Sequence, residues 1–315
     1  MSRFSGTVDK RTAQLGPEFE RKVRQARTAT WAAIADIDHE TLRIEQRRRR
    51  LEGNPDVEDC FRSKDGWFAI STQRRATYLE GTRHPHANTI EQVAEHSPSS
   101  RRAYHNGLWQ VLSPTTDLKT CMATVAAYGE DHLERIVTSL LSGLALDVAE
   151  SLAELRTTSA LVAQIRLLGH DGDRDRAFEL GCALAQALCY HAVNPKLRSV
   201  APKLWCIVSE CVLDGLKCDR FQFSRCDRGF SDFAIALDRR LWDVTGLYGT
   251  HRLVRGPAYR WTTIVDLNYE CIRGFATPGL EPPDALLSFL EVKSTPRTKP
   301  NVIEKDPLFR VLRTN

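Results

Sequence analysis

The sequence lacks long apolar runs and any segment suited to export. No stretch of about eighteen consecutive apolar residues occurs, so a helix that spans a membrane is not expected. The N-terminus, MSRFSGTVDKRTAQLG, has no apolar core of the kind that a signal peptide carries. These absences predict a protein that does not enter membranes and stays in the cytoplasm.

The sequence also lacks the motifs of several enzyme classes. It contains no glycine-rich phosphate loop, no GxSxG nucleophile elbow and no HExxH zinc motif. Its nine cysteines are an odd number, so they cannot all pair within the chain. Several, such as Cys182 and Cys189, lie in helical apolar patterns, where a free thiol behaves as a small hydrophobic group. We therefore expect no built-in cofactor and no fully paired disulfide framework.

A strong excess of charge of one sign is missing as well. The 44 basic and 40 acidic residues leave a net charge of +4, which does not by itself indicate a nucleic-acid partner. The distribution of charge is more informative, because the first 50 residues are rich in arginine and end with the run Arg47-Arg48-Arg49-Arg50. Four adjacent arginines cannot share one face of a helix, so some must point into solvent or towards an anionic partner.

Helical periodicity dominates what is present. A long helix is predicted over residues 17–52, and Gly53-Asn54-Pro55 stops it. Apolar residues at steps of three and four predict an amphipathic helix over 131–156 and a second helix that stops at Gly169. The predicted helices of this part of the chain cover residues 131–156, 158–168, 174–192, 200–217 and 230–245. Short polar turns between them favour a helical bundle.

From residue 276 onward the composition changes. Six of the 14 prolines lie between Pro278 and Pro307, which predicts an extended tail with one helical segment near Asp284 to Glu291. The predicted fold is mainly α, with a small helix-turn-helix-like module, a helical bundle domain and an extended C-terminal tail. The predicted segments are a basic N-terminal helix (1–59), the module (60–113), the helical domain (114–275) and the proline-rich tail (276–315).

The module contains the start and stop signals of short helices within residues 71–98, STQRRATYLEGTRHPHANTIEQVAEHSP. Ser71 or Thr72 can cap a helix that runs to Glu80, and Gly81 can end it in the left-handed conformation. After a turn over residues 82–86, a second helix is expected.

Asn88 is predicted to cap that second helix. Glu91, three residues further on, completes a capping box. Ser97-Pro98 then opens a third helix, with proline in its first turn. Two short helices joined by a tight basic turn form the local pattern of a helix-turn-helix unit.

Residues 79–85 (LEGTRHP) and 89–94 (TIEQVA) resemble the second half of the Xre, or lambda-repressor-like, helix-turn-helix family. In that family a recognition helix ends in a glycine, a short basic turn with a proline follows, and a capped amphipathic helix comes next. The resemblance covers residues 71–98, and the two helices that should precede the recognition helix are not recognisable in residues 60–70.

The resemblance implies a DNA-binding regulatory or accessory protein. Its partner would be double-stranded DNA, and the helical domain would hold a protein partner or a second copy of the chain. Glutamine and arginine are side chains that read base edges through paired hydrogen bonds. The residues implied at the major groove are Ser71, Thr72, Gln73, Arg74, Thr77 and Tyr78, and those implied at phosphates are Arg75, Arg83 and His84.

Two other functions stay open. The protein could be a helical interaction scaffold whose basic residues are only a solvated face. Alternatively, Asp284, Glu291 and Lys293 look like the PD-(D/E)xK nuclease signature, in which two acids bind Mg²⁺ and the lysine orients the attacking water. The seven-residue spacing of the two acids leaves little room for a turn between two strands.

Metal sites find weaker support in the sequence. Structural zinc sites favour cysteine pairs two to four residues apart, whereas the separations here are five, seven and eight residues. The cysteines concerned are Cys206, Cys211, Cys218 and Cys226, and buried thiols are the expected outcome. Two further patterns are noted, a histidine group (His84, His86, His96 and His105) and a His170-Asp171 pair of the HD phosphohydrolase type.

Overall fold

The computed structural model describes residues 16–52, 66–142, 151, 154–218, 221–223 and 290–292. Within them the fold is mainly α-helical, as predicted. No helix in this part of the chain combines the length and apolarity needed to cross a membrane. The helices are α2 (Pro17–Leu51), α3 (Thr72–Glu80), α4 (Ala87–Ala94), α5 (Pro98–Tyr104), α6 (Leu108–Val111), α7 (Leu118–Tyr128), α8 (Glu130–Ser142), α10 (Leu155–Asp171), α11 (Arg174–Val193) and α12 (Ala201–Cys211), with 3-10 turns η1 (Gly66–Ala69) and η3 (Leu213–Gly215).

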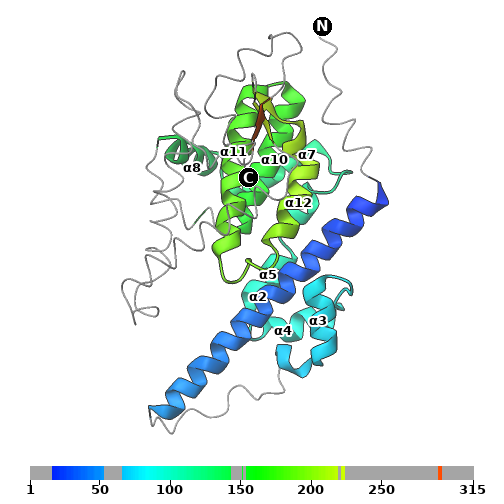
Figure 1. Ribbon diagram of the computed structural model, residues 1–315, viewed down its shortest axis with the longest axis vertical. Coiled ribbons are helices and arrows are strands. Elements are labelled where there is room, and N and C mark those ends of the chain that lie inside the picture. Colours follow the sequence, from blue (N-terminus) through cyan, green and yellow to red (C-terminus); the bar gives the residue numbers. More distant parts are fainter. Residues whose placement is uncertain are drawn as a thin grey trace, which may run out of the picture.

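Helix α2 is a long helix against which several other described elements pack (Figure 1). It begins with Pro17, whose fixed φ suits a first helical turn, and acidic residues occupy its first turn and arginines its last. This charge order stabilises the helix dipole. The helix confirms the predicted span to within one residue, and in Figure 1 it runs between α12 and the α3–α4 pair.

Two hydrophobic clusters share α2. The larger cluster contains Phe19, Val23 and Ala26 of α2 together with buried residues of α6, α7, α10, α11 and α12. The smaller cluster contains Trp31 and Ala32 of α2 together with residues of η1, α3 and α4. Because α2 contributes side chains to both clusters, it joins the 66–104 module to the helical domain.

Helix α3 begins and ends where the sequence predicts. Ser71 is its N-cap, and its hydroxyl oxygen accepts the Arg74 amide hydrogen at 3.4 Å. Gly81 ends the helix with φ of +78°, which favours glycine. A Cβ at this position would lie 2.3 Å from the carbonyl oxygen of Gln25, so glycine also allows α3 to approach the α2 backbone closely.

The prediction for the start of the next helix is wrong. Helix α4 begins at Ala87 after an extended His86, so Asn88 lies inside the first turn and cannot act as the N-cap. Glu91 pairs with Arg101 instead, at 3.1 Å. The third predicted helix is confirmed, since α5 starts at Pro98 with Ser97 before it.

The helical domain packs α10 between α7 and α11. Helix α10 passes through Gly169, where a stop was predicted, and ends at Gly172 with φ of +85°. An interior glycine costs a helix only about 1 kcal/mol, whereas the left-handed cap at Gly172 satisfies terminal carbonyl groups. The predicted single helix over 131–156 is also wrong, because Glu154 is extended and α10 starts after it. Helix α11 confirms the prediction for 174–192.

A small antiparallel sheet follows α12, which is shorter than the predicted 200–217 helix. Its strands are β1 (Lys217–Cys218), β2 (Phe221–Phe223) and β3 (Leu290–Val292), in the order β1-β2-β3. Glu291 of β3 lies opposite Gln222 of β2. The helix predicted to reach Glu291 is therefore wrong at residues 290–291, because backbone pairing with a distant strand is invisible to local periodicity. Residues 284–289 and the predicted helix over 230–245 lie outside the described residues.

Candidate nucleic-acid interface

Helix α3 exposes most of its surface. Thr72, Gln73 and Arg74, which the Xre resemblance places at the major groove, are all exposed. Thr77 is half-buried, and its hydroxyl donates to the Arg74 carbonyl oxygen at 2.8 Å within the helix. The first turn of α3 is therefore the part that is available to a partner.

The structure corrects the prediction that Tyr78 lies at the major groove. Its side chain is 1% exposed, and its ring packs edge-on against Trp31 with centroids 5.4 Å apart. Tyr78 lies roughly 140° around the helix from Gln73, on the side that faces α2. A residue buried in this way cannot reach a base edge, so Tyr78 anchors the helix and does not read DNA.

Two arginines flank Phe68 near the N-terminal end of α3. The guanidinium carbon of Arg75 lies 5.1 Å from the Phe68 ring centroid, and that of Arg43 lies 5.8 Å from the same centroid. Arg43 also pairs with Glu40 at 2.7 Å. Cation–π contacts of this kind hold guanidinium groups in place without neutralising their charge. Arg75, predicted at a phosphate, thus contacts the same aromatic ring as an arginine of α2.

Positive charge also gathers at the other end of α3. Arg83 and Arg24 are exposed there. The ring nitrogen Nδ1 of His84 lies 2.8 Å from the Thr28 hydroxyl. Partial burial and then the nearby Arg24 and Arg27 lower the pKa of His84, which favours the neutral ring at neutral pH. His84 therefore offers a hydrogen bond at this end, and the arginines supply the charge.

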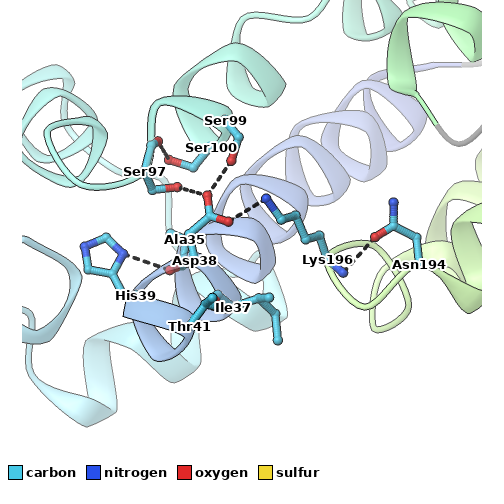
Figure 2. A network of polar contacts seen from close by, with 10 residues as sticks. All are labelled: Ala35, Ile37, Asp38, His39, Thr41, Ser97, Ser99, Ser100, Asn194 and Lys196. Carbon is cyan, nitrogen blue, oxygen red and sulfur yellow. Dashed lines mark hydrogen bonds and ion pairs between the residues drawn. The ribbon is translucent and has the colours of Figure 1, made fainter. Parts of the chain in front are cut away.

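A carboxylate clamp holds the module against the helical domain (Figure 2). Asp38 of α2 accepts the Ser97 hydroxyl at 2.6 Å and the hydroxyl of Ser99, and its other oxygen lies 2.6 Å from the Lys196 ammonium. Burial opposes ionisation of Asp38, but these hydrogen bonds outweigh it and lower the pKa of its carboxyl group. The clamp joins α2, the start of α5 and the turn before α12.

His39 anchors η1 on α2. Its Nε2 accepts the Trp67 amide hydrogen at 3.2 Å, and its Nδ1 lies 2.9 Å from the Ala35 carbonyl oxygen. Both bonds together require the neutral ring with its proton on Nδ1. Burial lowers the pKa of His39, although the Ala35 bond opposes the shift. The indole of Trp67 adds a 2.7 Å bond to Asp36.

A buried arginine links three segments of the helical domain. Arg166 of α10 is 8% exposed, donates to the Ser113 carbonyl oxygen at 3.0 Å and lies 3.1 Å from the Cys211 sulfur. Burial raises the pKa of the Cys211 thiol, which keeps it protonated. This group joins α10, α12 and the segment after α6.

The predicted metal patterns do not form a site in the described part of the chain. No group of three or more His, Cys, Asp or Glu residues there could hold a metal ion. Cys206 is exposed whereas Cys211 is buried, and Cys226 lies outside the described residues. His170 and Asp171 form an exposed 3.3 Å pair at the end of α10.

The nuclease signature is only partly described. Glu291 lies on β3, whereas Asp284 and Lys293 lie outside the described residues. The nuclease interpretation therefore stays a prediction from the sequence.

Sequence reasoning missed the groups that position α3. Trp31 lies far from α3 in the sequence, and only packing brings it against Tyr78 and against Trp67 of η1, which directly precedes α3. The sequence offered one signal for Arg43. It lies four residues after His39 in a long predicted helix, and residues with that spacing share one side of a helix. Such spacing extends the packed side of α2 towards its C-terminal end.

Comparisons of the chain with known protein families, with curated proteins and with solved structures find no match in any of the three. The Xre resemblance therefore depends on residues 71–98.

Proposed function

We propose that the protein binds duplex DNA, as a regulatory or accessory protein, with α3 entering the major groove. One observation carries the proposal: α3 buries only Tyr78 and leaves Thr72, Gln73 and Arg74 exposed. A helix whose only fully buried side chain is one aromatic ring, with its polar first turn directed outward, has the form of an element that is held for a partner. The Xre resemblance of the same residues indicates DNA as that partner.

The exposed residues have the chemistry for base recognition. A glutamine amide can form two hydrogen bonds with adenine, and an arginine guanidinium can form two with guanine. Gln73 and Arg74 supply one of each at the first turn of α3. Tyr78 takes no part, because it is in the core.

The ends of α3 carry the phosphate contacts in this proposal. Nine residues of helix are roughly 13 Å long, which is close to the width of the major groove, about 12 Å. Arg75 lies towards the N-terminal end and Arg83 follows the C-terminal end. Arginines separated in this way can contact the phosphates on the two sides of the groove while α3 lies between them.

The helical domain has a supporting role in the proposal. Helix-turn-helix proteins commonly bind two half-sites as dimers, so the helical domain would hold a second copy of the chain or a protein partner.

The test is binding to a mixed-sequence duplex, followed by fluorescence anisotropy over a series of salt concentrations. Wild type is compared with the double variant Gln73→Ala, Arg74→Ala. The matched control is Gln92→Ala, Arg102→Ala, which removes the same residue types from exposed positions on α4 and α5. We expect a log–log salt slope of about −0.9 per neutralised phosphate for wild type, with binding weakened in the α3 double and retained in the control.

Two results would overturn the proposal. Absence of wild-type binding at low salt would favour the scaffold function, in which the arginines are only solvated. Equal weakening in the two doubles would show that α3 is not the element that meets DNA.

A further inference from the structure

The side of α2 that packs on the module continues past it as a row of arginines. At about 100° per residue, positions separated by four and seven residues lie within roughly 60° of one another around a helix. Arg43, Arg47 and Arg50 have this spacing and therefore share one side of α2. His39 precedes Arg43 by four residues and belongs to the same side.

Contacts with η1 fix the direction of that side. His39 accepts the Trp67 amide hydrogen at 3.2 Å, and the guanidinium of Arg43 lies over Phe68. Figure 1 shows that the C-terminal end of α2 extends beyond α3 and α4. Arg47 and Arg50 are exposed on this extension, so they prolong the side of α2 on which the module sits.

The two other arginines of the run lie on other sides of α2. Arg48 pairs with Glu52 at 2.8 Å, and Arg49 pairs with Glu45 at 2.7 Å. Both lie roughly 120° or more around the helix from Arg43. The four-arginine run is thus divided by direction: two residues lie in line with the module, and two lie on other sides of the helix.

We infer that Arg43, Arg47 and Arg50 form a second phosphate-binding surface for the duplex that α3 reads. The inference rests on the proposed function. The row is about 10 Å long, which equals roughly three phosphate steps of one DNA strand along the duplex axis. Arg43 and Arg75 share the Phe68 ring, so the row begins where the phosphate contacts of α3 begin. The arginine row therefore contacts the duplex beyond the groove that α3 occupies.

The test compares two double variants of the full-length protein that remove equal charge. Arg47→Ala, Arg50→Ala removes two members of the row, and Arg48→Ala, Arg49→Ala is the matched control. All four positions are exposed, and circular dichroism checks that both variants fold. At about 0.1 M salt we expect the first double to raise the Kd at least about tenfold and to reduce the log–log salt slope by about 1.8, with a clearly smaller change in the control.

Equal shifts in the two doubles, or no shift in the first, would overturn the inference. If the first double is unchanged while Gln73→Ala, Arg74→Ala weakens binding, only the arginine row is overturned and the role of α3 stands. If wild type does not bind the duplex, the proposed function and the row are both overturned.

Discussion

Tyr78 illustrates at the residue scale how burial decides a role that residue type leaves open. We predict that Tyr78→Ala destabilises the protein by about 3–5 kcal/mol, because it removes an aromatic ring packed against two tryptophans. Tyr78→Phe keeps the ring and is expected to cost far less. Urea unfolding measures both values. A Tyr78→Ala protein of wild-type stability that no longer binds DNA would instead make Tyr78 a contact residue.

His39 gives the fold a dependence on pH. Its pKa is lower in the folded protein than the ordinary value of about 6.5, so its contribution to stability is complete above that pH. The contribution is lost as the pH falls through the folded pKa, because the protonated ring can no longer accept the Trp67 amide hydrogen.

Titration of the His39 ring protons by NMR tests this account. We expect a midpoint below about 6.5, with the free energy of unfolding decreasing as the pH is lowered through that range. The pKa of His39 also responds to the charges of His96, Asp38 and Asp36. The titrating signal must therefore be assigned to the His39 ring itself. A midpoint at or above the ordinary value would contradict the account.

At the scale of elements, Gly81 controls how closely α3 approaches α2. We predict that Gly81→Ala costs more than the 1–2 kcal/mol or so of left-handed strain alone, because its Cβ would meet the Gln25 carbonyl oxygen. Gly172→Ala is the control, since Gly172 has a similar positive φ and nothing within 4 Å of a Cβ. Thermal unfolding compares the two variants. Equal losses would show that strain alone explains the glycine at position 81.

Helices with local signals were the predictable part of the fold. The long α2 and the cap and stop of α3 follow from Pro17, Ser71 and Gly81. Helix α4 shows the limit, because Asn88 has the residue type of a cap but lies inside the first turn, after the N-cap position at His86. Strand β3 could not be predicted, since its partner β2 is distant in the sequence.

The location of the candidate site could be predicted from the sequence, whereas the residues that form it could be predicted only in part. The capping signals located α3, and Thr72, Gln73 and Arg74 are exposed polar residues of this helix, whose contact with DNA stays a prediction. Periodicity alone could not show that Tyr78 faces Trp31, because that contact joins segments far apart in the chain.

At the scale of the whole molecule, the Asp38 clamp joins the module to the helical domain. We predict that Asp38→Ala costs about 1.5–3 kcal/mol or more, since it leaves two hydroxyls and the Lys196 ammonium without their acceptor. Lys196→Ala removes only one of these bonds and is expected to cost less. Urea unfolding at neutral pH gives both values, and exposed Lys119→Ala is the control.

The stabilisation that the Asp38 clamp provides depends on pH in the acid range. The pKa of Asp38 is lower in the folded protein than in the unfolded chain, so its stabilisation is present above the ordinary aspartate pKa of about 3.9 and is lost as the pH falls through the folded value. The difference between wild type and Asp38→Ala is therefore expected to shrink in strong acid. A difference that stays constant to low pH would contradict the clamp.

We propose above all that α3 is the element that contacts DNA. Photo-crosslinking tests it most directly, with a photoreactive amino acid placed at Gln73 on α3 and, in a second protein, at Gln92 on α4, both exposed. Irradiation in low salt with a mixed-sequence duplex is predicted to attach DNA at position 73 and little at position 92. Equal crosslinking at the two positions, or none at 73, would contradict the claim.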